Sequence, residues 1–366
     1  MKRNSKLNLK GDTDMAKRTS TASAVLVLSL VAFGGAALAA SAEDDSFNKV
    51  SAGLYEKAKQ EGSVIIYSVW DVEHLVKITE AFSKRFPGIK TSYWQGRNPE
   101  IVTRVVIEFQ ANNPSVDAIL SDNAPPVIRA AGAIMPYETV QKNLLILHDP
   151  TMPVVSLQIQ TLSYNTKKLK AADAPKTWED VANAKYKGMV ALDDPMRAGP
   201  LSSMLAGLKG LWKDDARWTK FVQGLKALNV PLHKSTSAMM RLLVAGEYAI
   251  GMPTLLHDTL EEKETGSPID YAKTAPPIVF PRYAGIYAKA PHPNAAKLLT
   301  EWLISIEGQR TLDAVGRESS RKGFRSKASI DTAFPKGTRS IPVEDKLFLE
   351  DPKKWLDTNV KPIWGE

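Results

Sequence analysis

Short apolar runs alternate with longer amphipathic segments along most of this chain, and that alternation constrains the fold more than any other feature. The runs with the length and composition of buried strands are residues 63–69, 89–94, 116–121, 156–165, 188–194, 248–252 and 284–289. Segments of helical period separate them, as in residues 71–86, where apolar side chains share one stripe until Pro87-Gly88 stops the helix. This order predicts an α/β fold with mainly parallel sheets.

The first 42 residues belong to a different class of segment. Six basic side chains precede the apolar run AVLVLSLVAFGGAALA, which ends in small residues and is typical of a secretory signal peptide. Cleavage is expected after Ala39 or Ala42. The apolar run is too short for a membrane span, so we expect a protein exported to the periplasm without a direct membrane span.

Composition excludes several function classes. Removing residues 1–42 deletes six basic and two acidic side chains, which lowers the formal net charge from +8 to +4. No run of clustered Lys and Arg with interleaved aromatics indicates nucleic-acid binding. The chain has no Cys, which excludes disulfides and thiol catalysis. No Gly-x-Ser-x-Gly, HExxH or phosphate-loop pattern is present, so we expect a binding protein without a cofactor and not an enzyme.

Four strand-to-helix junctions carry residues suited to helix N-termini. They are QGRNPE after Trp94, SDNAPP after Leu120, DDPMRAGP after Leu192 and the segment HKSTSAMM. Each leaves unpaired backbone N–H groups at the carboxyl edge of a sheet, where ligands bind in open α/β folds. All helices need caps, but four such junctions, two of them with an arginine, predict a cleft that accepts an anion.

The junctions supply most of the candidate ligand-binding residues, which are Arg97, Asp122, Asn123, Asp194, Arg197, Ala198, Ser235 and Thr236. Each also has an ordinary structural interpretation. Arg97 and Arg197 either bind an anionic group bidentately or cover the surface. Asp194 precedes a proline and is either a turn former or a ligand contact. Asp193 and Asp194 point to opposite faces of an extended strand, so they cannot act jointly on one atom.

The order of segments resembles the extracellular solute-binding proteins of bacterial ABC importers, in the branch of ferric-ion, phosphonate, thiamine and polyamine binders. The matching text is EGSVIIYSVW, FSKRFPGIKTSYW, SVDAILSD, LSYNTKKL, APKTWEDVANAKYKGMVALDDP, AGEYAIGM and APHPNAAKLLTEWLISIEGQRTL, which covers most of residues 61–312. The resemblance implies a type 2 periplasmic binding protein-like fold, with two α/β lobes, hinge crossovers and a central cleft. The expected division is a signal peptide over 1–42, the first part of lobe 1 over 43–160, lobe 2 over 161–275, and a return to lobe 1 with C-terminal helices over 276–366.

The same resemblance adds four candidate residues. It implies that Tyr164, near the first crossover, faces the ligand, and that Ser68 and Trp70 line the wall of lobe 1. Trp70 either stacks on an organic ligand or fills the core. Tyr283, near the return crossover, either gates the cleft or is a structural side chain.

The resemblance also bears on metal binding. The ferric branch holds its metal with two adjacent tyrosines after the strand that corresponds to YAIGM, whereas this chain has PTLLHDTL there. Losing both phenolates removes most of a Fe(III) site. His257 and Asp258 are the residues that could form a remnant pair, and the other histidines lack ligand spacing, although His74 could reach the cleft. We therefore expect no metal.

The leading hypothesis is a monomeric periplasmic substrate-binding component of an ABC importer. It would capture a small organic solute bearing a carboxylate or a phosphoryl group and deliver it to a membrane permease with its ATPase subunits. One alternative is a ferric-ion-binding protein with a reduced ligand set. The others are an enzyme on the same fold, which would need the missing cysteine nucleophile, and a structural envelope protein, which needs no cleft.

Overall fold

The computed structural model describes residues 34–122 and 124–365. The chain divides into two units after Ala42, and the second unit runs from Glu43 to Glu366. The predicted signal peptide lies mostly outside the described residues, as does Asn123. Helix α1 runs over Gly34–Glu61. Among the described residues, no helix has both the length and the apolar character needed to cross a membrane.

One mixed sheet organises the chain, with the strand order β2-β1-β3-β10-β5-β8-β6-β7. These strands are β1 (Ser63–Ser68), β2 (Lys90–Gln95), β3 (Ala118–Ser121), β5 (Val154–Asn165), β6 (Val190–Asp193), β7 (Leu232–His233), β8 (Ile250–Leu255) and β10 (Ile278–Tyr287). Four short strands pair with the two long ones: β4 (Ile134–Met135) and β12 (Ile341–Pro342) pair with β10, and β9 (Ile269–Tyr271) and β11 (Glu318–Ser319) pair with β5.

The sheet is parallel at its two ends and antiparallel in the middle. Strand β1 pairs in parallel with β2 and β3, and β6 pairs in parallel with β7 and β8. The long strands β5 and β10 are antiparallel to each other. Strand β5 is also antiparallel to β8, and β10 is also antiparallel to β3. The predicted parallel pairing is therefore found at the ends and between β10 and β12, whereas β10 and β5 are antiparallel because β10 brings the chain back beside β5.

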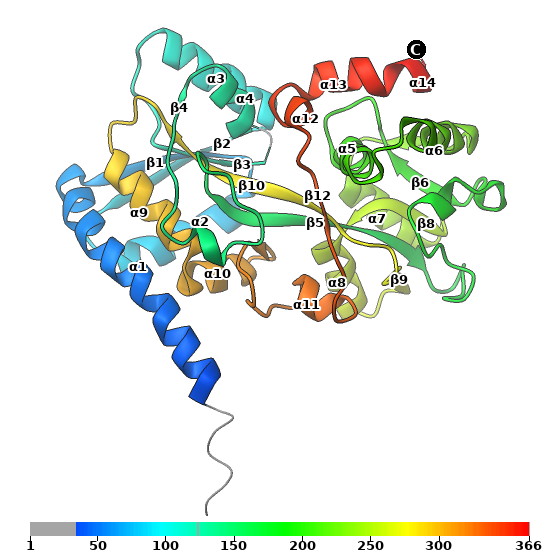
Figure 1. Cartoon of the computed structure of the whole chain (residues 1–366), viewed down its shortest axis with the longest axis horizontal. Helices are drawn as coiled ribbons and strands as arrows, with labels where there is room; N and C mark the ends of the chain where they lie inside the picture. The colour runs from blue at the N-terminus through cyan, green and yellow to red at the C-terminus, as the bar shows by residue number, and fades with distance from the viewer. Residues whose placement is uncertain (1–33, 123, 366) are drawn as a thin grey trace, which may run out of the picture. The chain divides into compact units, whose positions relative to one another are not determined.

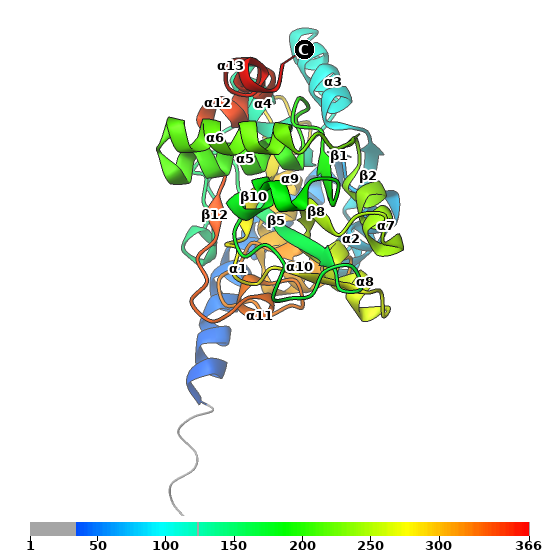
Figure 2. The same ribbon diagram turned by 90° about the vertical axis from the view of Figure 1, so that its right-hand side faces the viewer.

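Helices cover both faces of this sheet, as Figures 1 and 2 show. The longer ones are α2 (Val72–Arg85), α3 (Asn98–Gln110), α5 (Pro200–Trp212), α6 (Asp215–Ala227), α7 (Thr236–Ala245), α8 (Leu256–Glu264), α9 (Pro293–Ile304) and α10 (Ile306–Asp313). The shorter ones are α4 (Ala124–Ala130), α11 (Ile330–Ala333), α12 (Lys346–Glu350), α13 (Pro352–Asn359) and α14 (Lys361–Trp364), with 3-10 turns η1 (Lys142–Leu144), η2 (Glu179–Ala182) and η3 (Ala184–Tyr186).

The sequence signals for helix ends are confirmed at several junctions. Gly199 is the N-cap of α5, and Pro200 is its first residue. Ser235 caps α7, and its hydroxyl accepts a hydrogen bond from the Ala238 N–H at 3.2 Å. Gly246 ends α7 with φ 78°, a left-handed conformation that glycine adopts without a Cβ clash. Local chemistry therefore set where these helices begin and end.

The apolar side chains form separate cores on the two sides of the molecule. One core lies between β1, β3 and the helices α2 and α9, where Phe82 and Trp302 pack at 5.6 Å. Another lies under α5 and α6, and the C-terminal tail contributes to it, because Trp355 packs against Trp218 at 6.1 Å and against Phe348 at 5.2 Å. Figure 1 shows this tail, α12–α14, beside α5 and α6. The tail is thus joined to the part of the chain that contains residues 200–227.

Candidate functional site

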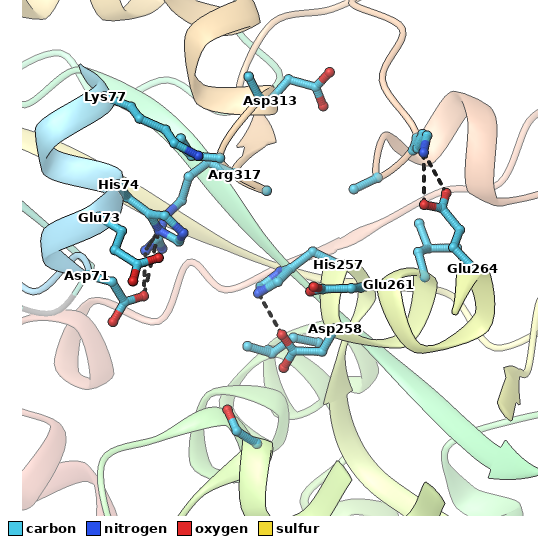
Figure 3. A pocket seen from close by; sticks show the side chains of 18 of the residues that line it. Asp71, Glu73, His74, Lys77, His257, Asp258, Glu261, Glu264, Asp313 and Arg317 are labelled. Carbon is cyan, nitrogen blue, oxygen red and sulfur yellow. Dashed lines mark hydrogen bonds and ion pairs between the residues drawn. The ribbon is translucent and has the colours of Figure 1, made fainter. Parts of the chain in front are cut away.

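A polar pocket of about 710 Å³ lies between α2 and α8, and Figure 3 shows it from close by. One wall comes from residues 71–77 at the start of α2, and the other from α8. Arg282 of β10 and Arg317, which follows α10, line its inner part. The pocket therefore joins four segments that are far apart in the sequence.

The inner part of this pocket holds buried charges whose hydrogen-bonding capacity is only partly used. Arg282 is 5% exposed, and Glu318 is completely buried. Arg282 Nη1 and Glu318 Oε2 lie 3.9 Å apart, which is too far for a hydrogen bond, and neither atom has a hydrogen-bond partner. A buried donor or acceptor without a partner is costly. Arg282 lines the pocket, and Glu318 lies behind it without lining the pocket itself.

Arg317 is the second buried guanidinium of the pocket. Its Nη2 donates to Nδ1 of His74 at 3.2 Å, and its guanidinium carbon lies 5.1 Å from the centre of the Trp70 ring, while its Nε has no partner. Burial, with the positive charge of Arg282 beside it, lowers the pKa of Arg317 to about 9. Burial and the Arg317 charge also lower the pKa of His74, which keeps that imidazole neutral and able to accept the hydrogen bond.

His257 adds a third positive charge. Its Nδ1 lies 2.9 Å from Glu318 Oε1, and its Nε2 lies 3.1 Å from Asp258 Oδ1. Burial lowers the pKa of His257, but the two carboxylates outweigh burial and raise it to about 9. Burial likewise raises the pKa of Glu318, but His257 and Arg282 outweigh it and hold that pKa below its usual range. At neutral pH His257, Arg282 and Arg317 are cations, and the carboxylates of Asp258, Glu318 and Asp71 lie within 4 Å of them.

A second, smaller cavity of about 170 Å³ contains three of the predicted residues. It is lined by Asn98, Asp122, Gln158, Arg197, Ala198, Gly199, Pro200, Ser203 and Phe280. Arg197 donates from Nη2 to Asp193 Oδ1 at 2.8 Å, and Asp122 Oδ1 accepts from Asn98 Nδ2 at 3.0 Å. Because Phe280 and Arg282 are two residues apart on β10, both cavities lie along one face of that strand.

Arg97 is not in either cavity. Its side chain is 84% exposed and donates from Nε to Glu100 Oε1 at 2.8 Å. Arg97 is the N-cap of α3, and Glu100 in the first turn of that helix draws the guanidinium along the surface. The structure thus places Arg97 on the surface outside both cavities, whereas Arg197 lines the smaller cavity, where the buried Asp193 already pairs with it.

Ser68, the last residue of β1, and Trp70 in the loop that follows are both buried. Ser68 donates to the Leu120 carbonyl at 2.8 Å and accepts from the Trp70 N–H at 3.1 Å, so its hydroxyl is occupied within the protein. Trp70 has no exposed surface and lies beneath Arg317. The structure supports the interpretation of Trp70 as a core aromatic. One face of its ring also packs against the guanidinium of Arg317.

The remaining predicted residues have structural environments. Tyr164 and Tyr283 are buried, and burial raises the pKa of both. Asp194 Oδ1 accepts a hydrogen bond from the Met196 N–H at 2.9 Å, and an aspartate that bonds the backbone two residues on is typical of a turn. Ser235 caps α7 and Thr236 is its first residue, and neither lines the two cavities.

Three important residues were not identified from the sequence: Arg282, Arg317 and Glu318. The only signal for Arg317 and Glu318 was a basic, loop-like stretch after Gly316. Glu318 belongs to a strand of two residues, β11, that pairs with Leu157 in the middle of β5. A pairing this short leaves no periodic pattern in the sequence, so only the folded chain reveals it.

Metal binding has little support in the described residues. They contain no group of three or more His, Cys, Asp or Glu side chains that could hold a metal ion. His257 and Asp258 do form the close pair that the sequence suggested. However, both ring nitrogens of His257 face carboxylates, and the protonated ring has no lone pair for a metal.

Comparisons with known proteins agree with this fold. Residues 73–310 match the model of the bacterial extracellular solute-binding protein family. An Fe(3+)-binding periplasmic protein of Serratia marcescens is 25% identical, covering 70% of this chain and 78% of that protein. A putative 2-aminoethylphosphonate-binding periplasmic protein of Salmonella typhimurium is 25% identical, covering 63% of this chain and 68% of that one. A Trichodesmium protein solved in complex with iron and citrate ligands has a TM-score of 0.68 at 18% identity, covering 82% of this chain and 99% of that one, which shows a shared fold.

Proposed function

Because this chain belongs to the bacterial extracellular solute-binding protein family, we propose that it captures a small organic anion in the pocket between α2 and α8. In this proposal it is the periplasmic component of an ABC importer, acts as a monomer, and delivers its ligand to a permease with ATPase subunits. The proposal includes the division into lobe 1 (43–160), lobe 2 (161–275) and the return segment (276–366), with the pocket between the lobes.

The observation that carries this proposal is the pair of buried guanidiniums with unused donors. Arg282 Nη1 and Arg317 Nε lack hydrogen-bond partners, and both side chains line the same pocket. A carboxylate or phosphoryl group would accept these bonds, and charge-assisted hydrogen bonds of this kind are the strong ones. An arriving negative charge would also offset the burial and the repulsion from Arg282 that together lower the pKa of Arg317.

The smaller cavity extends the proposed site. We assign Asp122, Arg197 and Ala198, which were predicted as ligand residues, to a second polar subsite on the same face of β10. Asp193 compensates most of the charge of Arg197, so this subsite suits polar groups such as hydroxyls rather than a second strong anion.

Titration calorimetry with organic phosphonates, phosphate esters and carboxylates tests the proposal. We expect Arg317→Gln and Arg282→Gln to weaken binding by about 10- to 100-fold, which corresponds to the loss of a charge-assisted hydrogen bond. Arg97→Gln is the matched control, because that exposed arginine lies outside both cavities. Thermal melting establishes that each variant is folded. Unchanged affinity in folded Arg282→Gln and Arg317→Gln would contradict the proposal.

Ferric binding is the second candidate, favoured by the similarity to the Serratia marcescens protein. Adding Fe(III) with a small anion and recording the visible spectrum separates the two candidates. If this protein binds organic anions without iron, the first candidate stands; if iron is required, the second candidate replaces it.

We also infer that the ligand is released without chemical change, which chromatography of the recovered ligand checks.

A further inference from the structure

On the walls of the large pocket, five carboxylates outnumber the cations Lys77, His257 and Lys327. Carboxylates come from both sides: Asp71 and Glu73 from the α2 side, and Asp258, Glu261 and Glu264 from α8. Figure 3 shows Asp71 and Glu73 on one side and Asp258 and Glu261 on the other, while Glu264 turns toward Lys327. The inner part, in contrast, contains the buried cations described above.

Most of these carboxylates already have a cationic neighbour. Asp258 pairs with His257 and Glu264 with Lys327, and Asp71 lies 3.8 Å from Arg317. Within the part of the chain that the structure describes, the side-chain carboxylates of Glu73 and Glu261 make no hydrogen bond or ion pair. One is on α2 and the other on α8, so two carboxylates without partners lie on opposite walls of one pocket.

This polarity has consequences for a ligand whose anionic end meets Arg282 and Arg317. The rest of that ligand lies between carboxylates. A second negative charge would be repelled there and a neutral group would gain little, whereas a protonated amine would be attracted from both walls. The unpartnered Arg282 Nη1, on a side chain that is 5% exposed, independently marks the inner end as a place for an anion.

We propose that this pocket selects small zwitterions, holding the carboxylate or phosphonate on Arg282 and Arg317 and the protonated amine between Glu73 and Glu261. This inference rests on the proposed function of the same pocket. It adds a second recognition element and makes Glu73 and Glu261 the residues that determine specificity.

Matched ligand pairs test the inference by calorimetry on the whole mature chain. The pairs are 2-aminoethylphosphonate with ethylphosphonate, and β-alanine with propionate, which differ only in the amine. We expect the wild-type protein to bind the amine-bearing member at least about tenfold more tightly. The double variant Glu73→Gln with Glu261→Gln should reduce that preference to less than about threefold, with affinity for the amine-free member unchanged or higher.

Glu80→Gln is the control, because Glu80 is an exposed carboxylate of α2 that does not line the pocket. It should keep the wild-type preference. Equal binding of both members of each pair by the wild-type protein would overturn the zwitterion inference and leave the anion site intact. A preference that survives in the double variant would overturn the roles of Glu73 and Glu261. Failure of all four ligands to bind would overturn the proposed anion site itself.

Discussion

The pairing of His257 with Glu318 should make the stability of this protein fall as the solution becomes alkaline. His257 Nδ1 lies 2.9 Å from Glu318 Oε1, and the His257 side chain is only 23% exposed while Glu318 is fully buried. Burial opposes protonation of the imidazole, but Glu318 and Asp258 outweigh it and raise the pKa from 6.5 to about 9. The folded state therefore holds a proton that the unfolded chain releases near neutral pH.

The size of the effect follows from these two pKa values. Each pKa unit corresponds to about 1.4 kcal/mol, so the interval from 6.5 to about 9 represents about 3 kcal/mol of folding stability. Because the folded-state pKa is the higher one, this contribution is fully present below pH 6.5 and is lost as the pH rises through about 9. Between pH 6 and pH 9 the free energy of unfolding should fall by about 3 kcal/mol from this residue.

Urea unfolding followed by tryptophan fluorescence measures this free energy at each pH. The comparison is between the wild-type protein and His257→Gln, since subtraction cancels other groups that titrate in the same interval. We expect the variant to be less stable at pH 6 and nearly as stable as the wild type at pH 9. Glu318→Gln should reduce the His257-dependent slope, because it removes the Glu318 charge that raises the His257 pKa while Asp258 remains. Parallel pH slopes for the wild type and His257→Gln would refute the reasoning.

Three further predictions concern packing and helix capping. Gly308→Ala should destabilise the protein by about 3 kcal/mol or more in thermal or urea unfolding, because the new Cβ would lie 1.9 Å from the Trp302 carbonyl oxygen. Gly210→Ala should instead stabilise the protein by about 0.5–1 kcal/mol, because that exposed glycine in helix α5 has nothing within 4 Å of its Cβ position. If Gly210→Ala destabilised the protein as much as Gly308→Ala, this explanation would be contradicted. Asp345→Ala should lower the free energy of unfolding by about 2 kcal/mol, because it removes the cap of α12 and the acceptor of the Trp355 indole N–H at 2.9 Å. An unfolding free energy equal to that of the wild type would show that water replaces both hydrogen bonds.

Local patterns predicted the elements of this protein well because they depend on neighbouring residues. The run 63–69 corresponds to β1 (Ser63–Ser68), and the segment 71–86 corresponds to α2 (Val72–Arg85). The amphipathic segment after Pro293 is α9. The signal was weaker for the long strands: the run 284–289 is only the end of β10, which begins at Ile278. Pro281 lies within that strand, and a proline normally argues against a central strand.

The candidate site was only partly predictable, for a different reason. Arg97 and Arg197 have the same local context, an arginine at the start of a helix after a strand, but only Arg197 lines a cavity. A carboxylate decides the outcome in each case: Glu100, three residues away, holds Arg97 on the surface, and the buried Asp193 holds Arg197 at the cavity. The burial of that carboxylate depends on the sheet, which the sequence pattern does not describe.

The sequence alone determined the secondary-structure elements, the helix caps and the α/β class, because propensity, periodicity and capping act over a few residues. Only the tertiary structure brought Arg282, Arg317, Glu318 and His257 together, because their meeting depends on the pairing of β5 with β10 and β11. Strand β5 is more than a hundred residues from β10 and β11 in the sequence, so their pairing leaves no local pattern. The charges that this pairing brings together could therefore be recognised only in the folded chain.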